Sequence, residues 1–213
     1  MIHDNRLLDV LLFLVVLAPS VILHEVAHGW VAERFGDPTA RDAGRITLNP
    51  MRHVDPVGSL IFPAFLALAQ QNVWGWAKPV PVNPAYFRRP NETMALVALA
   101  GPVTNLTLAF IGGRLGPFEE FQGQFYRTSP ELWARVVWAF VVVNVALAIF
   151  NMLPIPPLDG SRLLPLVLPQ RGKEIYYQVS QYGLLILFAL IFVFDGALAF
   201  VGDLIRQVLR VVI

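Results

Sequence analysis

Five long apolar runs alternate with polar segments along the chain and predict its architecture. The runs cover residues 7–23, 57–69, 94–111, 132–153 and 184–201. A helix that crosses the hydrocarbon core needs about 20 mostly apolar residues, a length that the last three runs meet. The first run meets it if its helix continues to about Phe35 with a kink at Pro19, whereas the second is short and contains Pro63. We therefore expect an all-α polytopic membrane protein with about five transmembrane or re-entrant helices.

Residues 74–84, WGWAKPVPVNP, form the most unusual polar segment. Val80 and Val82 alternate with prolines, and proline cannot donate a hydrogen bond to a β-ladder. We expect a short re-entrant β-strand or extended segment here, at the edge of a sheet rather than in its centre. The alternative is a surface loop that two tryptophans anchor at the membrane interface.

Residues 202–213 predict an amphipathic helix at the end of the chain. Asp203, Arg206, Gln207 and Arg210 would share one stripe of this helix, and the other positions are mostly apolar. Such a pattern is typical of a helix that lies in the membrane interface, although a simple extension of the last membrane helix is the alternative. No internal repeat is evident, so we expect a single domain over residues 1–213. Its predicted parts are a core, a C-terminal membrane helix and the interfacial tail, at residues 7–168, 176–201 and 202–213.

The composition supports a membrane protein and narrows the chemistry. The chain is 56% hydrophobic and 15% charged, against about 25% charged residues in soluble domains. A net charge of +1 supplies no basic field, so nucleic acid is excluded as a partner and the lipid bilayer is expected. The absence of cysteine excludes disulfides, thiolate ligands and thiol nucleophiles, so a metal site must use His, Asp or Glu. A cleaved signal peptide would have a positively charged start and an A-x-A cleavage site. Here Asp4 and Asp9 flank the only arginine and no A-x-A site follows, so we interpret the first run as a retained membrane segment.

The distribution of basic residues predicts an orientation. If the first helix runs inward, ten of the 16 Lys and Arg residues fall on the inner side. Cytoplasmic loops are enriched in Lys and Arg, so this bias favours an external N-terminus. The end of the first helix then lies toward the cytoplasm.

HEVAH, residues 24–28, is the strongest chemical signal. His24 and His28 are four residues apart and share one helical face, and Glu25 flanks them. This is the HExxH zinc motif, in which two imidazoles bind the metal and the carboxylate takes a proton from water. Polar residues in membrane segments are expensive and usually functional, which argues against a chance match.

A catalytic zinc site needs a third protein ligand. His3 lies too far away on the same helix, which leaves His53, Asp55 and Asp159 as candidates. Asp159 follows the fourth apolar run in the proline-rich segment 151–160, NMLPIPPLDG, where unwound backbone can project a short carboxylate. Taken alone this segment could be a plain exit loop, but the unfilled ligand position makes Asp159 the preferred choice.

Several motifs in order along residues 20–165 resemble the site-2 protease family of intramembrane zinc metalloproteases, peptidase family M50. They are HEVAH, AGPVTN at 100–105 and NMLPIPPLDG at 151–160. GRITLNPMRHVDPVG and GWAKPVPVNP resemble its compact prokaryotic members, which lack PDZ and CBS domains. The resemblance implies one Zn²⁺ held by His24, His28 and Asp159, with Glu25 as catalytic base. It also implies Asn151 as a substrate or oxyanion contact and a re-entrant β-segment near 74–84.

These observations predict an enzyme that hydrolyses peptide bonds within or near transmembrane segments of membrane-protein substrates. The extended segment would hold substrate by strand addition, with contacts at Val80 and Val82. Asn105 is expected to be a packing or substrate-adjacent residue, and Asn144 to serve contacts between helices. The expected location is a prokaryotic plasma membrane, with the active site toward the cytoplasm. The oligomeric state stays open, with a homo-oligomer as one alternative.

Three other functions fit the sequence less well. A CAAX-type prenyl-protein protease needs a distant glutamate ligand in a context that this chain does not offer. A transporter would show repeated halves. A non-catalytic adaptor or metal-binding scaffold is the main alternative, but a structural metal site does not need Glu25.

Overall fold

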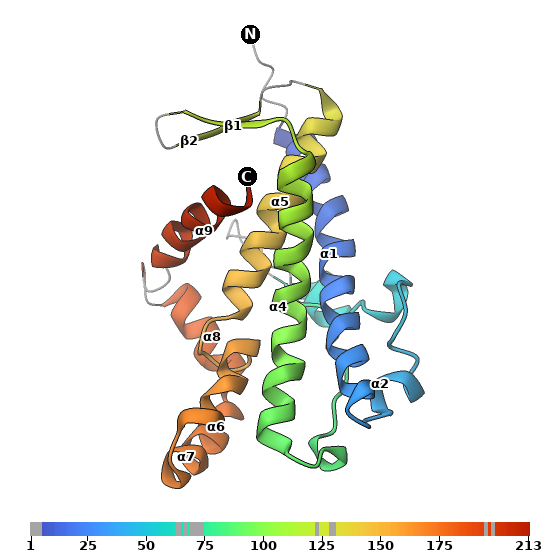
Figure 1. The fold of residues 1–213 in the computed structure, drawn as a ribbon, viewed down its shortest axis with the longest axis vertical. Helices are drawn as coiled ribbons and strands as arrows, with labels where there is room; N and C mark the ends of the chain where they lie inside the picture. The colour runs from blue at the N-terminus through green and yellow to red at the C-terminus, as the bar shows by residue number, and fades with distance from the viewer. Residues whose placement is uncertain are drawn as a thin grey trace.

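Three long helices pack together at the centre of the molecule in this computed structural model (Figure 1). The structure describes residues 6–62, 65, 68, 75–121, 124–127, 131–193, 196 and 199–213. The central helices are α1 (Arg6–Arg34), α4 (Pro90–Leu115) and α5 (Leu132–Asn151), and each contacts the other two. All three are long and apolar enough to cross a membrane. Pro19 and Pro102 lie inside α1 and α4 without ending either helix.

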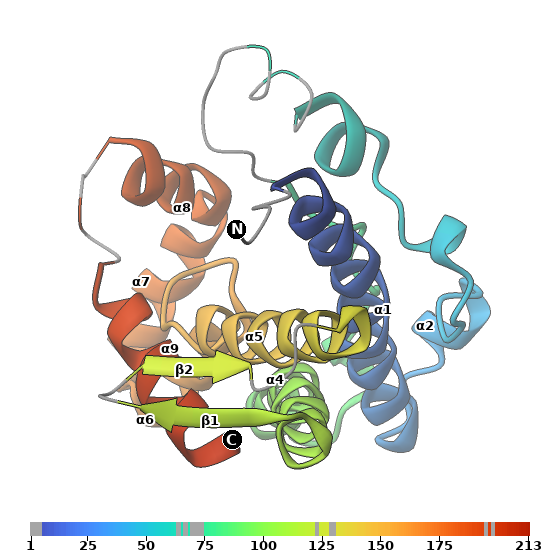
Figure 2. The ribbon, with the colours of Figure 1, turned by 90° about the horizontal axis from the view of Figure 1, so that it is seen from above.

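The core between these helices is made of small and branched apolar side chains. Ala109 on α4 and Val141 and Val145 on α5 are fully buried. The remaining short elements are α2, η1, η2, η3, η4 and α6, at Thr39–Asp42, Pro50–Arg52, Pro56–Ile61, Pro84–Tyr86, Asp159–Leu163 and Leu164–Val167. Helices α6 to α9 lie on one side of the centre and α2 on the other, as both ribbon views show (Figures 1 and 2).

The last predicted membrane helix, over residues 176–201, differs from the structure. The chain forms α7 (Gln170–Ser180) and α8 (Gly183–Phe192), which are bent by 73°. A Cβ at Gly183 would lie 2.8 Å from Pro156, so α8 begins where the chain packs closely against the proline-rich loop. The described helices thus provide three spans, or four if the bent pair counts as one. The predicted number of about five is not confirmed.

The second apolar run and the extended segment are described only in part. The run begins as the π-helix η2, whose first N–H groups at Val57 and Gly58 bond to the Asp55 carboxylate. Residues 63, 64, 66, 67 and 69 of the run and Trp74 lie outside the described residues. Residues 75–83 form neither a helix nor a β-ladder, so the predicted β-segment is not confirmed.

A β-hairpin joins α4 to α5, and the all-α prediction omitted it. Strands β1 (Phe118–Phe121) and β2 (Gln124–Arg127) are antiparallel, with Phe118 opposite Arg127. Phe118 packs edge-on against Trp138 of α5 at a ring separation of 5.3 Å. The hairpin lies at the end of the bundle where α4 ends and α5 begins (Figure 1).

The C-terminal residues form a separate amphipathic helix, α9 (Ala199–Val212), as predicted. Val201, Leu209 and Val212 are buried against the bundle, where α9 contacts α5 and α4. Gly196 has a φ of +79°, a conformation that favours glycine, and it precedes α9. The helix is therefore not a simple extension of α8.

Candidate metal centre

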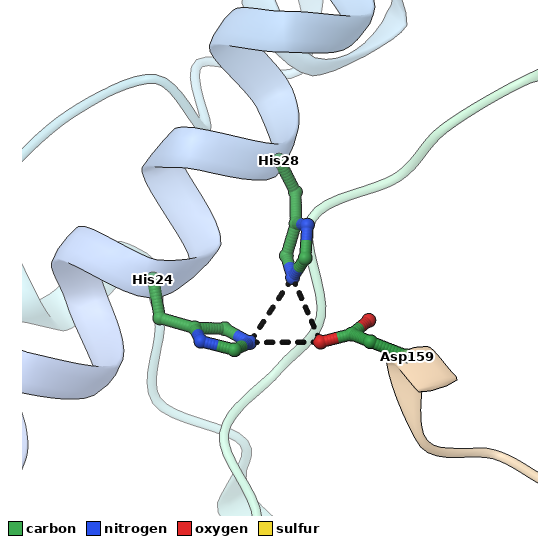
Figure 3. Close-up of side chains that lie close together, drawn as sticks. All are labelled: His24, His28 and Asp159. Carbon is green, nitrogen blue, oxygen red and sulfur yellow. Dashed lines mark hydrogen bonds and ion pairs between the residues drawn. The ribbon is translucent and has the colours of Figure 1, made fainter. Parts of the chain in front are cut away.

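The two histidines of HEVAH lie one above the other on the inner face of α1. His24 and His28 are 5% and 8% exposed, and their Nε2 atoms are 3.0 Å apart. Both rings point away from the helix axis toward the same point (Figure 3). The predicted helical pairing is therefore present.

Asp159 completes the cluster from a distant part of the chain. Its Oδ2 lies 3.1 Å from His24 Nε2 and 3.2 Å from His28 Nε2 (Figure 3). The residue begins η4, and a Cβ at the next residue, Gly160, would lie 2.1 Å from the Met152 carbonyl oxygen. Glycine therefore lets the loop close onto the end of α5, which directs Asp159 toward α1.

Gly101 on α4 provides the space in which the imidazoles meet. A Cβ there would lie 2.5 Å from His24 Cε1 and 2.5 Å from His28 Nε2. Any larger residue would therefore displace the ligands. The AGPVTN motif at residues 100–105, which contains Gly101, thus has a specific role at the cluster.

The outer nitrogens of both imidazoles face hydrogen-bond acceptors. His28 Nδ1 lies 2.7 Å from the Val97 carbonyl oxygen, and His24 Nδ1 lies 2.6 Å from Asn105 Oδ1. Each Nδ1 therefore carries the proton, which leaves the lone pair of each Nε2 facing the cluster. Metal-ligating histidines are held in this way by a second set of groups.

The donor set fits a zinc ion. Two Nε2 lone pairs and a carboxylate oxygen converge within 3.2 Å of one another, and such atoms repel unless a cation lies between them. His24, His28 and Asp159 would hold the ion with two imidazole nitrogens and one carboxylate oxygen, a ligand set typical of catalytic zinc sites, which keep one further position open. Within the described part of the chain, this is the only group of three or more such side chains that could hold a metal.

The charge on Asp159 suits a ligand role. Burial raises the pKa of the Asp159 carboxyl, but the hydrogen bonds and positive charge that His24 and His28 supply in their protonated form outweigh this and hold that pKa well below its usual range. A metal ion would take the place of this positive charge when the imidazoles are neutral and present their Nε2 lone pairs. The carboxyl is therefore ionised, as a metal ligand must be.

Glu25 lies beside the cluster and is held by the extended segment. Its Oε2 accepts a hydrogen bond of 2.8 Å from the Val80 backbone N–H. The Val80 side chain is buried against α1, where a Cβ at Gly29 would lie 3.0 Å from its Cγ1. Val80 thus meets Glu25 through its backbone and packs on α1 through its side chain.

Two buried charged residues that the sequence analysis did not select anchor this segment. Asp37 Oδ2 accepts the Asn83 N–H at 2.7 Å, and Arg45 donates to the carbonyl oxygens of Lys78 and Pro79. Asp37 is fully buried and Arg45 is 5% exposed. Both residues lie in a polar loop, and nothing in the sequence indicates that they contact residues 78–83, about 40 positions further along the chain.

The other candidate residues lie elsewhere. Val82 is partly buried and packs against a small core that includes Ala32 on α1. The Asn151 side-chain amide donates to the Leu147 carbonyl oxygen at 2.9 Å, within its own helix. His53 Nε2 bonds to the Thr47 carbonyl oxygen, and neither His53 nor Asp55 belongs to the cluster.

Proteins of one peptidase family are similar to this chain in sequence. The profile of peptidase family M50 matches residues 115–194. YwhC of Bacillus subtilis, which carries the provisional name of a zinc metalloprotease, is 37% identical over 83% of this chain and 78% of its own length. Rip2 of Mycobacterium tuberculosis, similarly named, is 34% identical over 80% of this chain, which spans 62% of that relative's length. No solved structure matches the chain.

Proposed function

The chain belongs to peptidase family M50, and from this premise we propose that it is an intramembrane zinc protease. Its substrates would be membrane proteins, cleaved within or near their transmembrane segments. The observation that carries the proposal is the cluster of His24, His28 and Asp159 with Glu25 beside it. Three of these four residues lie on α1, which is long and apolar enough to cross a membrane.

Zinc bound at such a site supplies Lewis acidity for the activation of water and of the scissile carbonyl. The histidines and Asp159 provide three ligands and leave one side of the site open. Their side chains are 6%, 10% and 15% exposed, so the cluster is largely, but not completely, shielded from solvent.

Glu25 is suited to move the proton. The Val80 N–H occupies Oε2, while Oε1 has no hydrogen-bond partner within the described residues. Oε1 can therefore accept a proton from water and pass it to the leaving amine. This arrangement favours catalysis over a scaffold, because the carboxylate stands beside the ligands without belonging to them.

The extended segment offers backbone groups to a substrate strand. Within the described residues, the N–H and carbonyl of Val82 and the carbonyl of Val80 have no hydrogen-bond partner. In an extended backbone, residues two apart point their N–H and carbonyl groups to the same edge. Val80 and Val82 would therefore share one edge, and on this edge the Val80 N–H already bonds to Glu25. Strand addition at Val80 and Val82 would thus hold a substrate unwound next to the base.

Three finer features extend the proposal. Asn151 would contact the substrate or the developing oxyanion once its amide leaves the Leu147 carbonyl. Because Lys and Arg are enriched on the side where α1 ends, the site would open toward the cytoplasm of a prokaryotic plasma membrane. Asn105 would support His24 rather than contact substrate, because its Oδ1 is engaged by that ring.

A conservative change at the base tests the proposal. Glu25→Gln keeps the side-chain shape but removes the proton acceptor, so cleavage of a single-pass reporter in proteoliposomes should fall at least about 100-fold. Zinc content should stay at one ion per chain, because Glu25 is not a ligand. Glu33→Gln, a neutralised glutamate near the end of the same helix, serves as the matched control and should cleave normally. Equal rates for Glu25→Gln and the wild type would contradict the proposal.

A further inference from the structure

A chain of hydrogen bonds crosses the buried centre of the bundle and ends at the metal site. Its members are Ser20 on α1, Asn105 on α4 and Asn144 on α5, and all three are 0% exposed. Buried polar groups are costly unless they are paired, and here each donor has an acceptor. This series of hydrogen bonds links all three central helices to His24.

Backbone carbonyl oxygens fix the orientation of the Ser20 hydroxyl and the Asn144 amide, which lie at the end of the series farthest from His24. The Ser20 hydroxyl donates to the Val16 carbonyl oxygen at 2.8 Å. Asn144 Nδ2 donates to the Phe140 carbonyl oxygen at 2.8 Å and to Ser20 Oγ at 2.9 Å. Because a carbonyl oxygen only accepts, the amide nitrogen of Asn144 must face it. Asn144 Oδ1 is thereby turned toward Asn105.

The same reasoning sets the amide of Asn105. Its Nδ2 donates to Asn144 Oδ1 at 2.7 Å and to the Ser20 carbonyl oxygen at 3.3 Å. Its Oδ1 therefore faces His24 Nδ1 at 2.6 Å and accepts the ring proton. With the proton on Nδ1, His24 Nε2 presents a lone pair to the cluster. The opposite amide orientation would favour a proton on Nε2, which would block metal binding.

We propose that Ser20 and Asn144 are positioning residues for the metal site, which they reach through Asn105. They hold the Asn105 amide in the orientation that keeps His24 in its metal-binding tautomer. The inference rests on the proposed metal site and extends it by two residues that touch neither ligand nor substrate. A role in helix packing alone, as expected from the sequence for Asn144, would contribute to stability and leave the affinity for zinc unchanged.

The test measures zinc binding in the purified full chain, by competition with a chromogenic chelator. Asn144→Leu removes the amide while filling a similar volume. The apparent zinc Kd should rise about tenfold, which is the smaller effect typical of mutating a group that hydrogen-bonds to a metal ligand. Ser20→Ala should change the Kd in the same direction, and it serves as the second variant if Asn144→Leu does not fold. Val145→Ala is the matched control, because Val145 is equally buried beside Asn144 and lies outside the chain of hydrogen bonds. It should lower stability and leave the zinc Kd unchanged.

A double-mutant cycle separates positioning from packing. Asn105→Leu should weaken zinc binding by about 10- to 100-fold, and Asn144→Leu should add no further loss in that background. Unchanged zinc affinity in both Asn144→Leu and Ser20→Ala, or losses that add fully, would overturn the inference. A wild-type chain that binds no zinc would overturn the proposed function as well, so the two failures are distinguishable.

Discussion

At the scale of single residues, the three candidate ligands His24, His28 and Asp159 meet at one point, and carbonyl oxygens from α4 face the outer nitrogens of both imidazoles. The four-residue spacing of His24 and His28 places both rings on one face of any helix. Asp159 followed from the need for a third ligand. The partners of the rings include the Val97 carbonyl, and a backbone group has no sequence signature. Asn105 stood out as a polar residue in an apolar run, but only the packing of α4 on α1 shows that it faces His24.

Gly101 gives a prediction at this scale. Gly101→Ala would place a methyl group 2.5 Å from both rings, so the ligands must move apart. Because a zinc site tolerates shifts of only about 0.2 Å in ligand distance, we expect at least a tenfold rise in the zinc Kd, measured by chelator competition.

Gly112→Ala is the control for this change. It adds the same methyl group on α4, 3.0 Å from Val141 and away from the ligands. It should lower thermal stability and leave the zinc Kd near the wild-type value. A Gly101→Ala variant that binds zinc as tightly as Gly112→Ala would show that the close approach has no part in metal binding.

At the scale of elements, the long apolar runs predicted α1, α4 and α5 because hydrophobic length is a local property. The bend between α7 and α8 depends on the close approach of Gly183 to the proline-rich loop, a distant contact that no local pattern reports. The hairpin between α4 and α5 is short and was not recognised in an all-α prediction. Residues 75–83 form no β-ladder, and their hydrogen bonds run to side chains and loops instead.

The extended segment gives a prediction for substrate binding. Val82→Pro removes the N–H that would pair with a substrate strand, while proline is compatible with extended backbone. The loss of one hydrogen bond should lower kcat/KM for a transmembrane reporter by about 3- to 10-fold.

Val82→Ala is the matched control, because it shortens the same side chain and keeps the N–H. Zinc content should be unchanged in both variants. If Val82→Pro and Val82→Ala cleave with the same kcat/KM, the backbone of this segment does not bind substrate.

At the scale of the whole molecule, the arrangement of helix ends explains how distant motifs meet. The end of α1, the start of α4 and the end of α5 lie toward the same end of the bundle (Figure 1), so the loops that carry Asp159 and the extended segment both reach α1. This follows from three antiparallel spans joined in order, and the membrane topology predicted from sequence already implied it. The depth of the candidate metal centre along the bundle was not predictable, because it depends on where the non-helical segments that follow α5 and precede α4 contact α1.

The most direct test of the central claim is the position of the bond that is cut. A single-pass reporter is reconstituted with the wild-type chain in proteoliposomes, and the products are identified by mass spectrometry. The account predicts a zinc-dependent cut within or beside the hydrophobic segment of the reporter, absent with Glu25→Gln. Cleavage confined to the soluble flanks, or no cleavage by a chain that holds one zinc ion, would contradict it.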